Sequence, residues 1–177
     1  TEVDTIVLLE RYSPFGLTSS LVLRRNVTIA AEAGARAILN ASASAEAPRR
    51  VLLVDGPGTV VRLVSVDVTG GFVSAWGAGV RVEGGSTLVL DDCRVRGNVM
   101  RATGRGPAAG GGIAILTGGR ALLDGTLVEG NEAASDGENA NGGGVLNNGV
   151  ANGGTLTAHG SRLVGNVARS NAGAATG

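Results

Sequence analysis

The chain has 177 residues and no net formal charge, and 43% of its residues are hydrophobic although only 2% are aromatic. This length and hydrophobicity suit one domain with a buried core, and four prolines are too few for collagen or a proline-rich linker. The interspersed charges form no basic stripe for a nucleic acid, and no apolar run reaches the ~18 residues of a membrane-spanning helix. Neither nucleic-acid binding nor membrane insertion is therefore expected.

The first 58 residues predict irregular β-structure. Residues 5–9 are strand-like, and the segment LVLRRNVTIAA predicts an early coil with inward-facing Leu21, Leu23, Val27 and Ile29. The next segment, GTVVRLVSVDVTGG, offers inward-facing Val61, Leu63, Val66 and Val68. We expect one continuous domain, with less regular N-terminal coils over 1–58 and regular coils of about 33 residues over 59–177.

An internal repeat occupies the rest of the chain. AGVRVEGGSTLVLDDCRVRGN (78–98) aligns without a gap on GGIAILTGGRALLDGTLVEGN (111–131), and a third copy covers 143–166. Apolar residues alternate within each copy and skip once, which is typical of two short strands joined by a bend. A β-sandwich is the structural rival, but copies at offsets of 33 and 35 residues are better explained by coils stacked on one another. The sequence predicts an all-β parallel β-helix of about five coils.

One asparagine closes each copy: Asn98, Asn131 and Asn166, each preceded by glycine. Equivalent positions of stacked coils lie above one another, so these side-chain amides can hydrogen-bond along the axis. We interpret them as a structural asparagine ladder.

The paired signatures GGGIAI before LVEGN, and GGGVLN before RLVGN, resemble the repeats of polymorphic outer membrane proteins and adhesins. They also resemble the wider pectin-lyase-like superfamily of right-handed parallel β-helices. The resemblance implies a secreted or cell-surface location, and either a surface protein or a polysaccharide-active enzyme. The leading hypothesis is a non-enzymatic structural or adhesive module that serves as a spacer, stalk or filament component. The alternative is a polysaccharide lyase or epimerase, or a carbohydrate-binding module.

The alternative enzyme would use Asp91 and Asp124 with Arg94. Polysaccharide lyases of this fold bind calcium with acidic residues on one strand face, and a nearby arginine or lysine abstracts the proton. The repeat places Asp91, Asp124 and His159 in one column, roughly 5 Å apart between coils. The competing interpretation is a solvated bend of short polar residues, with no catalytic residues, metal or cofactor. If the column does bind an ion, calcium is the candidate. One histidine and one cysteine exclude a multi-histidine or paired-cysteine zinc site.

The segments after Asn98 and Asn131 leave the stack at one corner, so we expect flexible loops that share one side of the stack. This side is the preferred binding surface, and a polysaccharide or glycan is a candidate ligand. One of them, SDGENANGG, lacks the spacing of a calcium loop.

Asn26 and Asn40 begin two N-x-S/T sequons and are candidate glycosylation sites. The tail SNAGAATG resembles a loop leading into another coil, so we expect the C-terminal end to be covered by more of a longer parent or by another protein segment or subunit.

Overall fold

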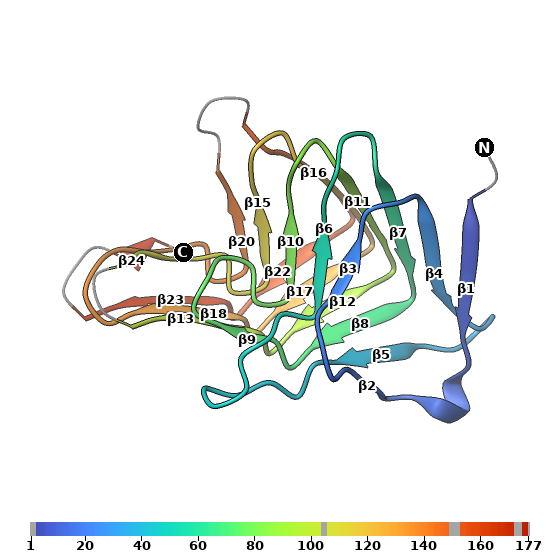
Figure 1. Ribbon diagram of the computed structural model, residues 1–177, viewed down its shortest axis with the longest axis horizontal. Helices are drawn as coiled ribbons and strands as arrows, with labels where there is room; N and C mark the ends of the chain where they lie inside the picture. Colours follow the sequence, from blue (N-terminus) through green and yellow to red (C-terminus); the bar gives the residue numbers. More distant parts are fainter. Residues whose placement is uncertain (1–2, 104–105, 149–152, 172–174, 177) are drawn as a thin grey trace.

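The computed structural model describes residues 3–103, 106–148, 153–171 and 175–176. The fold is a stack of parallel coils (Figure 1), and the expected all-β parallel β-helix of about five coils is confirmed. The strands form five sheets, here called A to E, and every strand pair among the described residues is parallel. The described part also contains one 3-10 turn, Glu10–Tyr12, and no helix long and apolar enough to cross a membrane.

Sheets A, B and C form the walls of the stack. Sheet A contains β1 (Asp4–Leu8), β4 (Val27–Ala31), β7 (Val60–Val64), β11 (Thr87–Asp91), β16 (Arg120–Asp124) and β21 (Thr155–His159). Sheet B contains β2 (Phe15–Gly16), β5 (Ala37–Asn40), β8 (Val66–Thr69), β12 (Arg94–Arg96), β17 (Leu127–Glu129) and β22 (Arg162–Val164). Sheet C contains β3 (Leu21–Leu23), β6 (Leu52–Val54), β10 (Val80–Val82), β15 (Ile113–Ile115) and β20 (Val145–Asn147).

The register shows how one coil lies on the next. One inward column of sheet A runs through Asp4, Val27, Val61, Leu88, Ala121 and Leu156. Successive members differ by 23, 34, 27, 33 and 35 residues, so coil length varies in the first part of the chain and settles near the predicted 33 residues in the later coils. Because side chains alternate between the two faces of a strand, this register sends every second residue into one shared core.

The main core is built from small and β-branched side chains. It takes Val27, Val61 and Leu88 from sheet A, and it is continuous with buried residues of sheets B and C such as Val95 and Ile113. Short side chains suit a narrow interior in which the same position recurs in every coil.

The sequence placed one early segment wrongly. Leu21 and Leu23 were aligned with the sheet A positions, but they pair with Leu52 and Val54 in sheet C. Instead, Val27 and Ile29 take the sheet A positions beside Val61 and Leu63. The error arises because apolar alternation is the same in all three sheets, and only pairing distinguishes them.

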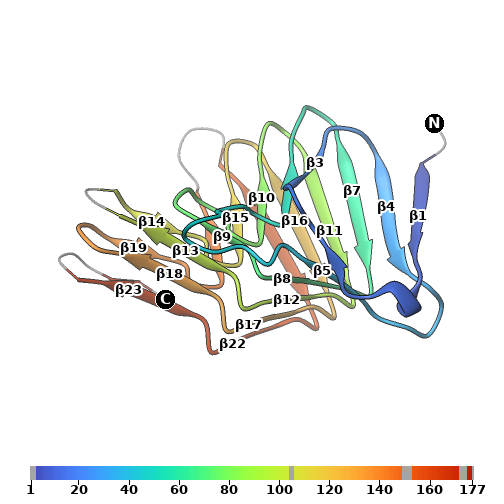
Figure 2. The same ribbon diagram turned by 60° about the horizontal axis from the view of Figure 1, so that its bottom comes forward.

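Two further sheets form a lobe beside the stack (Figure 2). Sheet D contains β9 (Phe72–Val73), β13 (Val99–Ala102), β18 (Glu132–Ser135) and β23 (Val167–Ser170). Sheet E contains β14 (Ala108–Ala109), β19 (Ala140–Asn141) and β24 (Ala175–Thr176). A second, smaller core fills the lobe, with Met100, Ala102, Ala108, Ala133 and Ala140 among its buried residues.

The lobe corrects the expectation of flexible loops after Asn98 and Asn131. Both segments contain paired strands, since Val99 pairs with Glu132 and Ala108 with Ala140. Alanine and serine gave no clear strand pattern in the sequence. The stacking of equal excursions from successive coils supplies the missing hydrogen-bond partners.

Candidate functional site

The lobe joins the stack at a narrow neck built around the three asparagines. Asn98 Nδ2 donates to Asn131 Oδ1 at 3.0 Å, and Asn131 Nδ2 donates to Asn166 Oδ1 at 2.9 Å. Each Nδ2 also reaches a strand carbonyl, that of Val68 from Asn98 and that of Val95 from Asn131. The structure thus brings the three asparagines into one hydrogen-bonded column at the point where each coil leaves sheet B.

Glycines of the returning segments complete the neck. A Cβ at Gly112 would lie 2.5 Å from the carbonyl oxygen of Gly144 and 3.0 Å from the side-chain amide of Asn131. Gly144 stands in the same relation to Asn166, with the amide 2.8 Å away. The Gly-Gly-Gly and Gly-Asn motifs, which recur as a pair in the sequence, are therefore the two sides of one contact.

A second ladder lies at the bend between sheets A and B. Thr126 Oγ1 donates to the carbonyl oxygens of Leu90 and Asp124 at 3.1 and 3.2 Å, and it accepts from the backbone N–H of Cys93 at 3.3 Å. Ser161 Oγ in turn accepts from the N–H of Thr126 at 3.1 Å. The alternation of the repeat placed Thr126 and Ser161 among the inward apolar positions. Their hydroxyl groups were the available signal that they form a polar ladder instead. Burial raises the pKa of the Cys93 thiol, which belongs to this column, to about 11, so it stays protonated at neutral pH.

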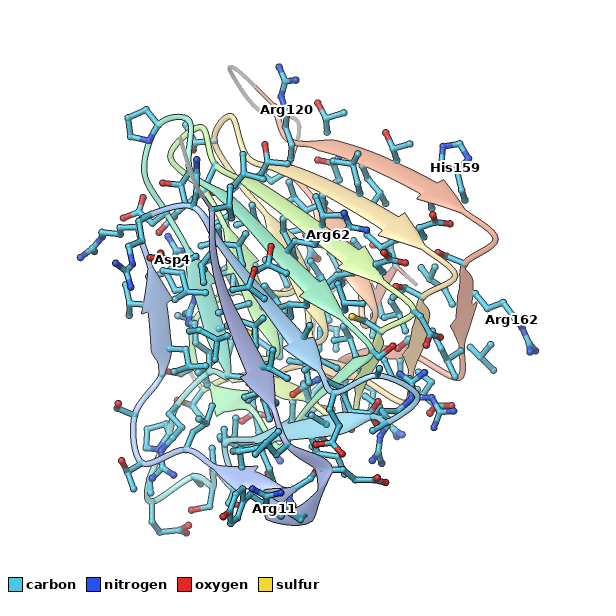
Figure 3. All side chains as sticks on the ribbon, turned by 90° about the vertical axis from the view of Figure 1, so that its right-hand side faces the viewer. Asp4, Arg11, Arg62, Arg120, His159 and Arg162 are labelled. Carbon is cyan, nitrogen blue, oxygen red and sulfur yellow. The ribbon has the colours of Figure 1, made fainter. Side chains whose placement is uncertain are left out.

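The predicted acidic column lies on the outer face of sheet A, beside the same bend. Asp91 pairs in register with Asp124, and Asp124 with His159, which projects from this face in Figure 3. Arg62, on the same face, forms an ion pair with Asp91. Arg94 lies across the bend on sheet B, in register with Asp67. The structure therefore brings the two aspartates together but places Arg94 on a different sheet.

Carboxylates on the sheet B side of the bend are held by arginines. Arg36 donates to Asp92 Oδ2 at 2.9 Å and contacts Asp67 at 3.4 Å, while Arg96 donates to the other oxygen of Asp67 at 3.1 Å. The side chain of Asp67 is almost fully buried by these two partners.

The pKa of Asp92 shows the sign of the charge around it. Burial alone would raise this pKa, but hydrogen bonds from Ser65 and Arg36, with the positive charges of Arg36 and Arg94, bring it below the ordinary value. The sheet B side of the bend is thus a positively charged environment, which favours anionic groups.

Two adjoining hollows open on the lobe side. One, of about 430 Å³, is lined by Trp76, Arg81 and Pro107, and Trp76 Nε1 donates to the carbonyl oxygen of Pro107 at 3.3 Å. The other, of about 600 Å³, is lined by Phe72, Pro48 and an ion pair between Arg101 and Asp136. Ser74 and Thr103 line both hollows, so together they make a groove between lobe and stack that contains two of the four aromatic side chains.

The two sequon asparagines lie in different places. Asn26 is exposed just before β4, and its Oδ1 accepts the N–H of Val60 at 2.8 Å. Asn40 is half-buried at the end of β5, where its Oδ1 accepts the N–H of Ser42 at 2.8 Å. Both side-chain oxygens are thus engaged, and glycosylation at either residue stays a prediction.

Among the described residues, no group of three or more His, Cys, Asp or Glu side chains is arranged to hold a metal ion. Comparison with known proteins finds no match to a family model, to a curated protein or to a solved structure. The function is therefore argued from the chain's own geometry.

Proposed function

We propose that this chain is a non-enzymatic structural or adhesive module of a secreted or cell-surface protein, where it serves as a stiff spacer, stalk or filament component. Its regular coils stack in register through six strands of sheet A and six of sheet B, and two polar ladders fix that register. The location rests on the resemblance of the repeat to surface proteins.

One observation carries the proposal: three of the carboxylates beside the bend, those of Asp91, Asp92 and Asp67, are already neutralised by arginines. Asp91 pairs with Arg62, Asp92 with Arg36, and Asp67 with both Arg36 and Arg96. A lyase needs carboxylates that can bind a cation beside the substrate and a base that can accept a proton. The ion pairs of Asp91, Asp92 and Asp67 with Arg62, Arg36 and Arg96 are those of a structural charge network.

Incubation with polygalacturonate or alginate tests this proposal through the release of unsaturated uronates by a lyase, and through the change in uronate composition that an epimerase would cause, measured by NMR spectroscopy. The wild-type protein should release none, with or without added calcium. If cleavage or epimerisation occurred, and Asp124→Ala abolished it while the control Asp136→Ala retained it, the enzymatic alternative would replace the structural one.

The C-terminal coil is the proposed contact with a further protein segment. Leu163 continues the inward column of Val68, Val95 and Val128 in sheet B, yet it is 53% exposed in the described structure. A strand pairing with β22 would bury it and contribute roughly 1–2 kcal/mol from this side chain. Sedimentation tests this contact. A protein segment or subunit that associates with the wild type at this coil should fail to associate with Leu163→Arg.

Carbohydrate binding is the second candidate, favoured by the groove that holds Phe72 and Trp76. Aromatic faces with nearby hydrogen-bonding groups suit a sugar ring, and arginines at both hollows suit an acidic one. We expect the wild type to bind sugars on a glycan array and Trp76→Ala to lose this binding. Tyr12→Ala should retain it, because Tyr12 is an exposed aromatic residue outside the groove. Equal binding by both variants would contradict this candidate.

A further inference from the structure

The bend between sheets A and B changes character along the stack. The bend residues Ser65, Asp92, Gly125 and Gly160 follow one another in successive coils, and all four have positive φ angles between 48° and 57°. The first two carry side chains, whereas the last two are glycines. Because Gly125 and Gly160 have no side chain, a hollow of about 180 Å³ opens beside them.

Arginines line this hollow. Arg94 and Arg162 both pair in register with Leu127, one on each side, so their Cα atoms are about 10 Å apart, or two strand spacings. Arg36 also lines the hollow. Bonds of 2.9 Å to Asp92 Oδ2 and 2.7 Å to the Asp92 carbonyl oxygen hold it in place.

The charges at the hollow do not cancel. Three arginines and one carboxylate, Asp92, line it, and that carboxylate is bound by Arg36. Within the described part of the chain, neither Arg94 nor Arg162 forms an ion pair, and both are exposed. Figure 3 shows Arg162 extending from β22 into solvent. Two further acids lie near the hollow: Asp67, which is in register with Arg94, is held by Arg36 and Arg96. Asp124 lies on the outer face of sheet A, one residue before Gly125.

We propose that this hollow binds a tetrahedral oxyanion, sulfate or phosphate, between Arg94 and Arg162. Guanidinium groups bind such anions through charge-assisted, bidentate hydrogen bonds, and a long arginine side chain can turn from solvent onto the anion. Arg36 binds Asp92 and so keeps that carboxylate away from the anion, and Thr126 with the two glycines also lines the hollow. The proposal concerns a different surface from the carbohydrate groove and does not rest on the proposed function.

Calorimetric titration with sodium sulfate and sodium phosphate, at ionic strength held constant with sodium chloride, tests the site. The wild type should bind at least one of the two anions, and the comparison identifies which. The double variant R94Q/R162Q should bind at least about tenfold more weakly, because both charge-assisted contacts are removed. R120Q is the matched control, since Arg120 is an exposed arginine on the outer face of sheet A (Figure 3), and it should bind like the wild type.

A second variant tests the hollow itself while keeping every arginine. G125N fills the space, and asparagine adopts positive φ more readily than most residues. A Cβ at Gly125 meets no atom within 4 Å, so this variant should fold, as circular dichroism would verify, and should lose the anion. Three results would overturn the proposal: no binding beyond that of chloride, an equal loss in R120Q, or full binding by G125N.

Discussion

Asn131 Oδ1 accepts two hydrogen bonds from Asn98, one from its backbone N–H at 3.1 Å and one from its Nδ2 at 3.0 Å. Asn131 repeats both contacts toward Asn166 as the donor, at 3.1 and 2.9 Å. One buried side chain therefore satisfies polar groups of two coils at once. Because an asparagine offers donors and acceptors on one planar group, it can continue such a column in both directions.

Replacement of Asn131 by alanine should destabilise the fold more than any exposed substitution. It leaves the buried N–H of Asn98 and the carbonyl oxygen of Val95 without partners, at a cost of about 3 kcal/mol in the free energy of unfolding. Urea unfolding measures this change. Asn147→Ala, at an exposed asparagine of β20, is the control and should change stability by less than about 0.5 kcal/mol. Equal effects of the two variants would contradict a structural role for the ladder.

Gly112→Ala should disrupt the neck of the lobe. The added methyl group would lie 2.5 Å from the carbonyl oxygen of Gly144, so either the return strand or the amide of Asn131 must move, at a cost of about 2–3 kcal/mol. Gly16→Ala is the matched control, because a Cβ there meets no atom within 4 Å, and its stability should stay within about 1 kcal/mol of wild type. Hydrogen exchange should locate the loss of protection in sheets D and E.

Thr126→Val should reveal the second ladder. The change keeps the shape of the side chain but removes the acceptor for the buried N–H of Cys93, which costs about 1–3 kcal/mol. Thr157→Val makes the same exchange on the exposed face of sheet A and should be close to neutral. If thermal unfolding showed both variants equally stable, the Thr126 hydroxyl group would have no structural role.

Arg50 presents a different case, a half-buried cation with one unpaired donor nitrogen. Its Nη1 is the one buried side-chain nitrogen or oxygen without a hydrogen-bond partner among the described residues. Burial, with a smaller contribution from Arg81, lowers the pKa of Arg50 to about 10, well below the ordinary value of an arginine side chain. Arg50→Met should therefore stabilise the protein at neutral pH by about 1 kcal/mol.

The sign of the pH dependence follows from that pKa. Above about pH 10, and up to the ordinary pKa of arginine, the unfolded chain binds a proton at Arg50 that the folded chain has lost, so the wild type gains stability relative to Arg50→Met as the pH rises. Unfolding experiments at pH 7 and above pH 10 measure this difference. The neighbouring Arg49 provides the contrast: it donates to the carbonyl oxygens of Leu17 and Ala41 at 3.1 and 2.7 Å, so Arg49→Met should destabilise the protein. A destabilising Arg50→Met would contradict the argument.

The sequence alone predicted the parallel β-helix, its approximate number of coils and the alignment of Asn98, Asn131 and Asn166. Such predictions succeed because each coil repeats the same local pattern, and a repeat of fixed length requires equivalent residues to stack. The register of Asp91 with Asp124 follows from the same alignment.

Only the tertiary structure decided what those residues contact. It showed that the amide of Asn131 fills the space beside Gly112, that Arg62 rather than Arg94 pairs with Asp91, and that alanine-rich excursions stack into a lobe. Alternation along one strand reports which face a residue takes, but not which of several sheets it joins or which charge lies across a bend. Those contacts link residues about 30 positions apart, and they depend on how the coils are placed in space.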